Sequence, residues 1–314
     1  MSTYTYSRDH LVRPQYERFF AEEQEIGWEA AIEAMIARRD VPKSSKVPFF
    51  LSDQKRNDFV FLLPIEDNSV VLDYGAGWGN TSYTFSKYCK QVIALDADFD
   101  RLHLANRHFA YRGANNVQTI YGGTSWDLPF ADATFDIVVF NGVLEWMPLS
   151  MEGVPTDVHR RVLGEINRVL KPGGSVMISI ENRFGYRHLM GNKDYHCGGL
   201  RWAPFLPRAL ANLYSQFWLG RPYRAWFHSY NILHELLADC GYEGTKIYSY
   251  YPDHVKYSCI FPLDDENVLR KTLKRLLKLP TLRKSERLLF KFFSTHSSFK
   301  YFAQDFLTIG YKPK

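Results

Sequence analysis

The sequence has no long apolar run, and its few cysteines show no paired spacing. Over 314 residues, no uninterrupted apolar stretch reaches the length of a bilayer-spanning helix. The opening MSTYTYSRDH lacks the apolar core of a secretory signal. The cysteines at positions 89, 197, 240 and 259 suit reduced thiols better than disulfides or a zinc site. We therefore expect a cytoplasmic protein without a metal centre. The sequence gives no indication of oligomeric state.

Motifs for binding phosphate or nucleic acid are also missing. Without G-K-[ST] the chain has no P-loop, and without G-x-G-x-x-G it lacks the dinucleotide fingerprint. No N-P-P-Y-type motif for base methylation is present, and no groove-reading module is apparent. We therefore expect no nucleic-acid partner.

Positive charge is concentrated near the C-terminus. The whole chain carries a net charge of +5, but residues 268–300 contain ten Lys or Arg and only Glu286 as an acid. Leucines at helical spacing run through the same segment, which predicts one or two basic amphipathic helices over 264–293. Two interpretations stay open for residues 264–300. The leucines pack on the protein, or the segment contacts the anionic inner face of a membrane beside a lipid-linked acceptor.

Strand and helix patterns alternate through the middle of the chain, which predicts an α/β fold with a parallel sheet covered by helices on both faces. Strands are expected at residues 70–73, 91–98, 117–123, 135–142, 175–182, 245–251 and 305–312. Helices are expected at residues 14–39, 55–63, 81–89, 99–112, 156–170, 231–241 and 264–293.

The stretch VVLDYGAGWGNTS, residues 70–82, joins the first strand to a helix through three glycines at alternate positions. Glycines there permit a tight turn and let a ligand approach the backbone. Asp73 directly before the loop would repel a phosphate and suits a ligand with a positive amino group. Asp96 ends the second strand, where a carboxylate can accept hydrogen bonds from both ribose hydroxyls.

The segments GGTSWDLPFADATFDIVVFNGVLEWM and INRVLKPGGSVMISIENR follow in order. With the glycine loop, they resemble the class I S-adenosylmethionine-dependent methyltransferases over residues 65–182. The resemblance implies a Rossmann-like seven-stranded methyltransferase sheet and S-adenosyl-L-methionine as cofactor. It places Asp73, Gly75, Ala76, Gly77 and Gly79 at the methionine part, Asp96 and Ala97 at the ribose, Thr124, Ser125 and Trp126 at the adenine, and Asn141 and Gly142 beneath the sulfonium. Many relatives have an acid at position 124, so Thr124 reads the adenine amino group more weakly or Asp127 substitutes.

Six segments follow from these patterns. They are an N-terminal helical segment (1–64), the cofactor-binding core (65–182), a cap or substrate-recognition insertion (183–230), a return to the core (231–263), a basic helical insertion (264–300) and a final strand (301–314).

Transfer of a methyl group to a hydroxyl requires alignment and removal of a proton. Many small-molecule relatives have a histidine where this chain has Trp146, so the base must come from elsewhere. The candidates are His196 and His228 in the insertion. Glu145 is a third candidate, with helix capping or an ion pair as its structural alternative.

The insertion also resembles a bacterial methyltransferase group associated with surface polysaccharide or glycolipid gene clusters. Its aromatic, Arg and Asn side chains suit a sugar ring or an acidic acceptor, although single aromatics there are expected in the core. The substrate candidates are Asn182, Arg183, Tyr186, Arg201, Arg208, Tyr223, Arg224 and Tyr230.

The favoured function is O-methylation of a sugar or glycolipid acceptor. The alternative is methylation of a small natural product at O, N or C. A non-catalytic adenosyl-ligand-binding protein is disfavoured by the intact Asp73, glycine loop and Asp96, and a nicotinamide oxidoreductase by the glycine spacing.

Overall fold

The computed structural model describes residues 11, 13–38, 55–194, 196, 198–254, 257–296 and 298–314. The chain forms two compact units. The first comprises residues 1–129 and 134–139, and the second residues 130–133 and 140–314. The six segments above therefore remain a prediction of functional organisation. Part of the N-terminal segment and Cys197 lie outside the described residues.

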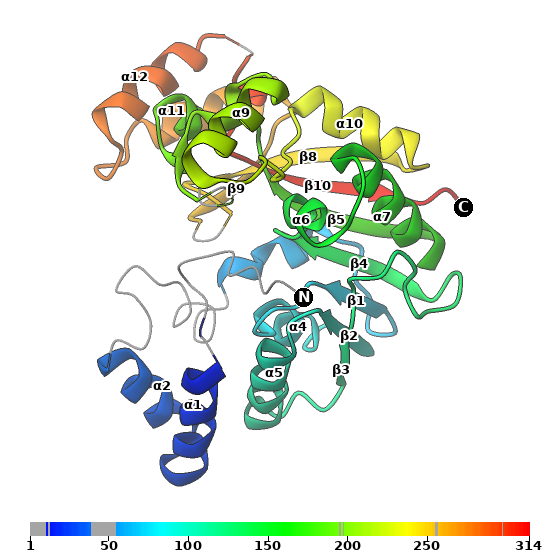
Figure 1. The fold of residues 1–314 in the computed structure, drawn as a ribbon. Coiled ribbons are helices and arrows are strands. Elements are labelled where there is room, and N and C mark those ends of the chain that lie inside the picture. The colour runs from blue at the N-terminus through cyan, green and yellow to red at the C-terminus, as the bar shows by residue number, and fades with distance from the viewer. Residues whose placement is uncertain are drawn as a thin grey trace. The chain divides into compact units, whose positions relative to one another are not determined.

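Within the described residues, eight strands form one sheet in the order β3-β2-β1-β4-β5-β10-β8-β9 (Figure 1). Its strands are β1 (Val70–Tyr74), β2 (Gln91–Asp96), β3 (Val117–Tyr121), β4 (Phe135–Asn141), β5 (Leu170–Glu181), β8 (Glu243–Tyr251), β9 (Cys259–Pro262) and β10 (Asp305–Tyr311). β1 pairs in parallel with β2 and β4, and β2 with β3. β10 runs antiparallel to β5 and β8, and β9 antiparallel to β8.

The α/β fold class predicted from the sequence is confirmed, with eight strands in place of seven. The additional strand is β9. It is only four residues long, ends in proline and lies at the sheet edge, so its sequence carries little periodicity. A separate two-stranded hairpin, β6 (Lys193–Asp194) with β7 (Leu200–Arg201), was also not predicted.

The first unit places helices beside β1, β2 and β3. They are α1 (Arg13–Ile26), α2 (Trp28–Ala37), the 3-10 helix η1 (Lys55–Leu62), α4 (Asn80–Phe85) and α5 (Phe99–Arg112). Asp98 caps the start of α5, where its side chain accepts a hydrogen bond from the Arg101 N–H, and Gly113 caps the end in a left-handed conformation. These are the usual helix start and stop signals.

The N-terminal helical region is two helices, where the sequence suggested one from 14 to 39. Gly27, with φ of 83°, separates α1 from α2, and a backbone at positive φ cannot continue a right-handed helix. The indole of Trp28 stacks on the His108 ring of α5 with centroids 5.2 Å apart. This aromatic contact attaches α2 to α5.

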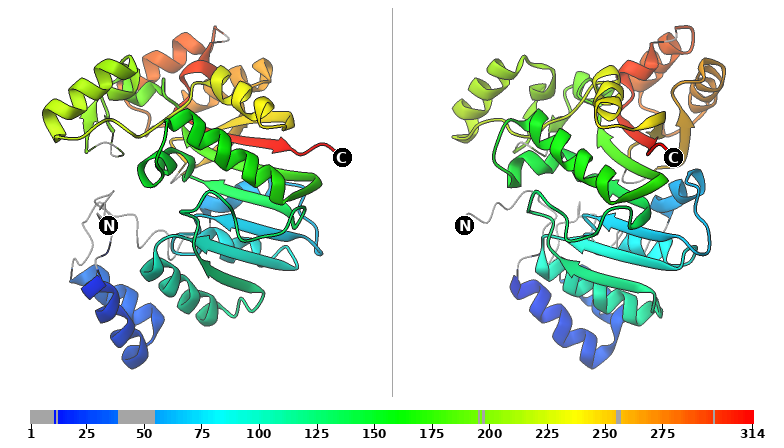
Figure 2. Two further views of the ribbon diagram at one scale, coloured as in Figure 1. Left: turned by 45° about the vertical axis from the view of Figure 1, so that its right-hand side comes forward. Right: turned by 90° about the vertical axis from the view of Figure 1, so that its right-hand side faces the viewer.

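The second unit carries the remaining helices (Figure 2). They are η2 (Leu144–Trp146), α6 (Met147–Ser150), α7 (Pro155–Val169), α8 (Tyr186–Leu189), η4 (Ala203–Phe205), α9 (Arg208–Leu219), α10 (Tyr230–Asp239), α11 (Glu266–Leu276), α12 (Lys284–Phe293) and α13 (Phe299–Phe302). Tyr186, Phe290 and Phe299 pack together in its core, with the Phe290 and Phe299 centroids 5.5 Å apart. The basic segment thus folds as two helices, anchored through α12.

Candidate functional site

The glycine loop after β1 turns sharply back over the end of β2. Gly75, Gly77 and Gly79 have φ values of 84°, 55° and 81°, a region that other residues rarely adopt. The N–H groups of Gly75 and Ala76 donate to the Leu95 carbonyl. A Cβ added at Gly77 would meet no atom within 4 Å. The loop therefore leaves its backbone accessible there.

Gly79 has a different role because it starts α4 against α5. A Cβ at this position would lie 2.5 Å from Phe109 Cζ and 2.9 Å from Ala105 Cβ. Real atoms do not approach so closely, so only glycine allows α4 to begin this near α5. The same position also needs its positive φ.

Two buried carboxylates frame the loop. Asp73 Oδ2 accepts a hydrogen bond of 2.6 Å from Ser82 Oγ. Asp96 Oδ2 accepts from the Gly77 N–H at 2.7 Å, and Asp96 Oδ1 from the Asp98 N–H at 2.8 Å. Burial raises the pKa of the Asp96 carboxyl, while Arg101 and the two backbone donors oppose that shift. Both acids are thus fixed beside the glycines.

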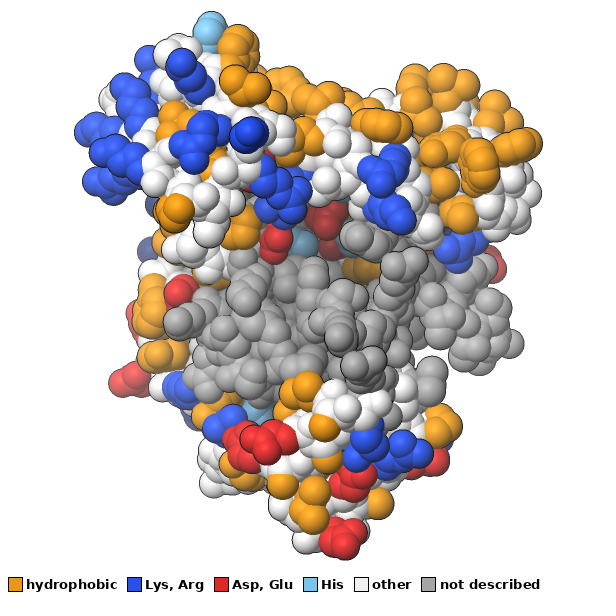
Figure 3. Space-filling view, turned by 90° about the vertical axis from the view of Figure 1, so that its left-hand side faces the viewer, with side chains coloured by type: hydrophobic (Ala, Val, Ile, Leu, Met, Phe, Trp, Pro, Cys, Tyr) orange, Lys and Arg blue, Asp and Glu red, His pale blue; other side chains and the backbone are white. Residues whose placement is uncertain are grey.

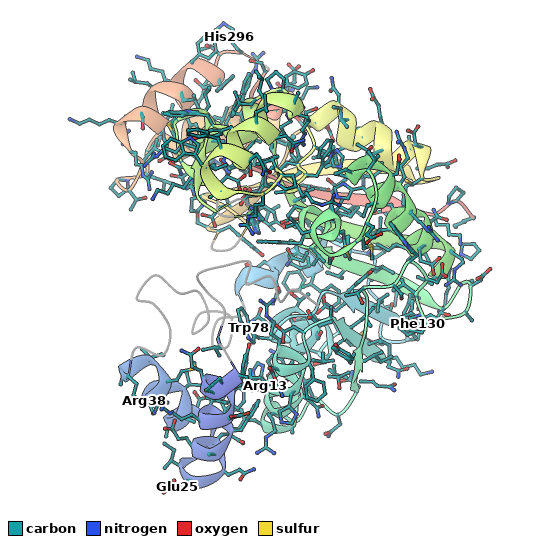
Figure 4. The ribbon with its side chains drawn as sticks, in the orientation of Figure 1. Arg13, Glu25, Arg38, Trp78, Phe130 and His296 are labelled. Carbon is teal, nitrogen blue, oxygen red and sulfur yellow. The ribbon has the colours of Figure 1, made fainter. Side chains whose placement is uncertain are left out.

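The loop is also braced by the first helix. Trp78 lies between two of the glycines, and its indole N–H donates to the Tyr16 hydroxyl of α1 at 3.0 Å (Figure 4). The Arg101 guanidinium lies 5.0 Å from the Trp78 ring centroid. The sequence analysis did not assign Tyr16 or Trp78 to the site.

The residues predicted at the adenine follow β3. Thr124 and Ser125 are exposed and Trp126 is half-buried. Ser125 Oγ donates to the Asp127 carbonyl at 2.8 Å. Their predicted contact with adenine stays a prediction, as does the contact of Ala97 with the ribose.

In the second unit, Asn141 ends β4 and Gly142 follows it, at the position where the resemblance places the sulfonium. Asn141 Oδ1 is buried and has no hydrogen-bond partner among the described residues. A buried amide oxygen normally has a partner, so this atom suits the positively polarised end of the methyl donor. A Cβ at Gly142 would lie 3.7 Å from His254 Nε2 and 3.8 Å from Glu145 Oε1.

His196 and Glu145, which the sequence analysis proposed separately, meet in one group beside Gly142. His196 Nε2 lies 3.7 Å from Glu145 Oε1. His196 Nδ1 faces Asp194 Oδ1 at 3.3 Å and Glu181 Oε2 at 3.9 Å. We call His196, Glu145, Glu181 and Asp194 the His196 cluster.

The negative charges of the His196 cluster raise the pKa of the His196 imidazole. Burial by itself lowers the pKa of His196, but the negative charges of Glu181, Asp194 and Glu145 outweigh it and hold the pKa well above the ordinary value. Asp194 is fixed in turn, because its Oδ2 accepts from the Tyr223 hydroxyl at 3.0 Å and its Oδ1 from the backbone N–H of His196 at 2.9 Å. The imidazole is thus both oriented and made more basic.

Two further histidines adjoin this group: His188, which the sequence places among the polar residues of the insertion, and His254, which the sequence analysis missed. His188 Nε2 lies 3.1 Å from Glu181 Oε2, and His254 Nδ1 lies 3.1 Å from Asp305 Oδ2. Ligand atoms of Glu181, His254 and Asp305 fall within 4.8 Å of one another. We interpret them as an ion-pair network, because each carboxylate already has a histidine partner. Glu181 is the last residue of β5, and Asp305 is the first residue of β10, which runs antiparallel to β5. Two acidic residues at paired strand ends were the sequence signal that could have predicted this group.

His228 is paired with a second histidine. It is buried, and its Nε2 lies 2.7 Å from Nδ1 of the equally buried His159. Burial lowers the pKa of His228 to about 3, so the imidazole is a weak proton acceptor. Its backbone carbonyl also accepts from the Arg183 N–H. These contacts favour a structural role for His228, and its role as a base stays a prediction.

The predicted substrate residues bond to the protein itself. Five of these side chains donate to backbone carbonyls: Asn182 to Ala303, Arg183 to Pro204, Arg201 to Gly191, Arg208 to Ala225 and Arg224 to Pro148. The three tyrosines donate to carboxylates: Tyr186 to Glu286, Tyr223 to Asp194 and Tyr230 to Asp264. Their residue types suit carbohydrate, but they equally satisfy the carbonyls of irregular backbone. In this structure these side chains tie irregular segments of the second unit together, and their contact with a substrate stays a prediction.

Comparison with known proteins agrees with this geometry. Residues 72–178 match a family model described as a methyltransferase domain. An uncharacterized methyltransferase, YcgJ of Bacillus subtilis, is 33% identical over 108 residues, covering 34% of this chain and 39% of that protein. A demethylmenaquinone methyltransferase of Thermobifida fusca is 34% identical over 111 residues, covering 35% and 42%. The chain thus spans about two fifths of the length of these relatives.

Among solved structures, that of YcgJ from Bacillus subtilis has a TM-score of 0.45 and 16% identity, covering 82% of this chain and 97% of that one. Residues 72–178 are a class I S-adenosylmethionine-dependent methyltransferase domain. S-adenosyl-L-methionine is the cofactor of this domain.

Proposed function

We propose that the protein transfers a methyl group from S-adenosylmethionine to a hydroxyl of a sugar or glycolipid acceptor, with His196 as the proton acceptor. The observation that carries this proposal is the position of the His196 cluster. It borders Gly142, the residue that the family resemblance assigns to the sulfonium end of the donor.

When bound, S-adenosylmethionine supplies an electrophilic methyl group, so the protein must supply alignment and a base. Asp194 and Glu181 face His196 Nδ1, which favours a proton on that nitrogen and leaves Nε2 to accept one. Nε2 points toward Glu145 Oε1, and Glu145 Oε2 is buried without a hydrogen-bond partner among the described residues. An acceptor hydroxyl between these groups can donate to either.

Trp146 supports the same assignment. Its ring lies 4.4 Å from the His196 ring, so the insertion supplies a histidine beside the position where small-molecule relatives are expected to carry one. A hydroxyl needs such a base during transfer, whereas a neutral amine already has a free electron pair. An aromatic face beside the base also suits stacking of a sugar ring. Both features favour a hydroxylated ring as acceptor over the alternative of a general natural product.

Methyl transfer to hydroxyls can be tested with S-adenosylmethionine labelled in its methyl group. Polysaccharide, lipid and small-metabolite fractions from a strain lacking the gene would be incubated with the enzyme. We expect label in the glycan or lipid fraction as methyl ethers, which survive mild alkali. Label confined to alkali-labile esters, to methylamines or to the small-metabolite fraction would contradict the proposed acceptor.

The charge of the His196 cluster predicts a shifted pH profile. Turnover needs neutral His196, so it should rise with pH as the imidazolium loses its proton. The charged groups facing the ring are Glu145, Glu181 and Asp194, with His188 beyond Glu181. Glu145→Gln removes one negative charge and lowers the pKa of His196. The half-maximal pH of turnover should then fall by about 1 unit.

The matched control is Glu152→Gln. Glu152 lies shortly after Glu145 in the sequence, and its side chain is exposed. It should leave the pH profile unchanged. A rise in the half-maximal pH of the Glu145 variant, or identical profiles in all three proteins, would argue against His196 as the titrating base.

A further inference from the structure

Helix α9 in the insertion has its large apolar side chains on the outside. Leu213, Phe217 and Trp218 are 67%, 81% and 64% exposed, and Leu210 is exposed on the same side. The residues that α9 buries are the small Ala211 and Ser215. A surface helix normally buries its large apolar residues, so α9 shows the opposite arrangement. The spacing of 210, 213, 217 and 218 makes one continuous apolar stripe.

The two basic helices differ in how much of their apolar side they bury. In α11, Leu269, Leu273 and Leu276 are all buried, so the predicted leucine face packs on the protein. In α12, Phe290 and Phe293 are buried, while Leu288 and Phe292 are exposed. The exposed basic residues of the segment are Lys271, Lys274, Arg275, Lys278, Arg283, Lys284, Arg287 and Lys291.

These features belong to one end of the second unit. The ribbon views place α9, α11 and α12 at the same end (Figures 1 and 2). The space-filling view shows Lys and Arg side chains gathered at one side of this end and a group of hydrophobic side chains at its other side (Figure 3). No acidic residue occurs in α9 itself. We call the surface formed by the exposed residues of α9, α11 and α12 named above the α9–α12 face.

Among the described helices, none is both long enough and apolar enough to cross a membrane.

We propose that the α9–α12 face docks on the surface of an anionic lipid bilayer. The stripe of Leu, Phe and Trp is suited to insertion at the boundary between headgroups and acyl chains, and tryptophan favours that boundary. Lysines and arginines near the surface add attraction to anionic headgroups. A second copy of the chain is a poorer occupant, because two such faces would bring like charges together. Docking would hold the enzyme at lipid-linked acceptors.

Vesicle binding tests this without donor or acceptor, so its outcome is independent of the proposed methyl transfer. The full chain would be sedimented with phosphatidylcholine vesicles with and without phosphatidylglycerol. We expect pelleting with the anionic vesicles that weakens with salt. The double change Phe217→Ser and Trp218→Ser should reduce the apparent affinity at least about tenfold. Charge reversal of Lys271 and Lys274 should remove the preference for phosphatidylglycerol.

The control is Phe61→Ser, which removes a residue that is 70% exposed in the first unit and should leave binding unchanged. Brominated lipids should quench tryptophan emission in the wild type, and this quenching should decrease in Trp218→Phe. Equal pelleting with both vesicle types would overturn the proposal, as would equal loss in the Phe61 variant. So would a dimer in solution that the Phe217 and Trp218 changes dissociate while vesicle binding is absent throughout.

Discussion

Replacing His196 with alanine is expected to lower the rate of methyl transfer about 10²- to 10⁴-fold, the usual contribution of a positioned general base. The loss should appear in turnover and not in cofactor affinity, because Asp73, the glycine loop and Asp96 are unaltered. Single-turnover rates would measure the first quantity, and calorimetry with S-adenosylhomocysteine the second. His196→Gln should be similarly slow, since an amide retains polarity without accepting the proton.

Two other histidines serve as controls for this experiment. His234 is exposed on α10, and its change to alanine should leave the rate unaltered. His228→Ala removes a buried partner of His159 and should reduce thermal stability. If His196→Ala turns over as fast as the wild type, the proposed base is wrong even if the protein proves to be a methyltransferase.

Replacing Gly79 with alanine is expected to destabilise the protein by about 2–5 kcal/mol, from a left-handed backbone and an overpacked contact. The added Cβ would overlap the Phe109 ring and Ala105, so α4 must move from α5. Because Gly79 belongs to the loop, affinity for S-adenosylhomocysteine should also fall at least about tenfold, or about 1.4 kcal/mol. Urea unfolding and calorimetry would measure the two effects.

Gly164 provides the matched glycine control. It lies exposed within α7 without a positive φ, and an added Cβ there meets nothing within 4 Å. Gly164→Ala should therefore raise stability by about 0.5–1 kcal/mol and leave cofactor affinity unchanged. Equal stability of the Gly79 and Gly164 variants would show that the α4–α5 contact does not constrain the loop.

The core of the fold could be read from the sequence because its signals are local. Residues 70–82 contain the strand, the acid and the glycines in one short stretch of sequence. The apolar runs of β1, β2 and β4 are buried as expected. Short edge elements such as β9 have too few residues for a clear pattern. Gly27 was visible in the sequence, but its φ, and thus the break between α1 and α2, depends on packing against α5.

The acceptor side was harder to predict because residue type does not reveal the partner. Arg224 suits a phosphate, yet its guanidinium donates to the carbonyls of Pro148 and Met151. His196 and His228 looked equivalent in the sequence. In the structure His196 faces three carboxylates, and His228 faces a second buried imidazole. The pKa of His196 is therefore raised, and that of His228 is lowered.

The sequence by itself determined the α/β class, the position of the glycine loop and the methyltransferase domain, because these depend on neighbouring residues and short periodic patterns. Only the tertiary structure decided which side chains share a site and which surface stays exposed. Glu145, Glu181 and the neighbouring residues Asp194 and His196 come from three separate segments that chain folding brings together. The apolar stripe of α9 has the same helical spacing as a buried one, and only packing shows that it faces outward.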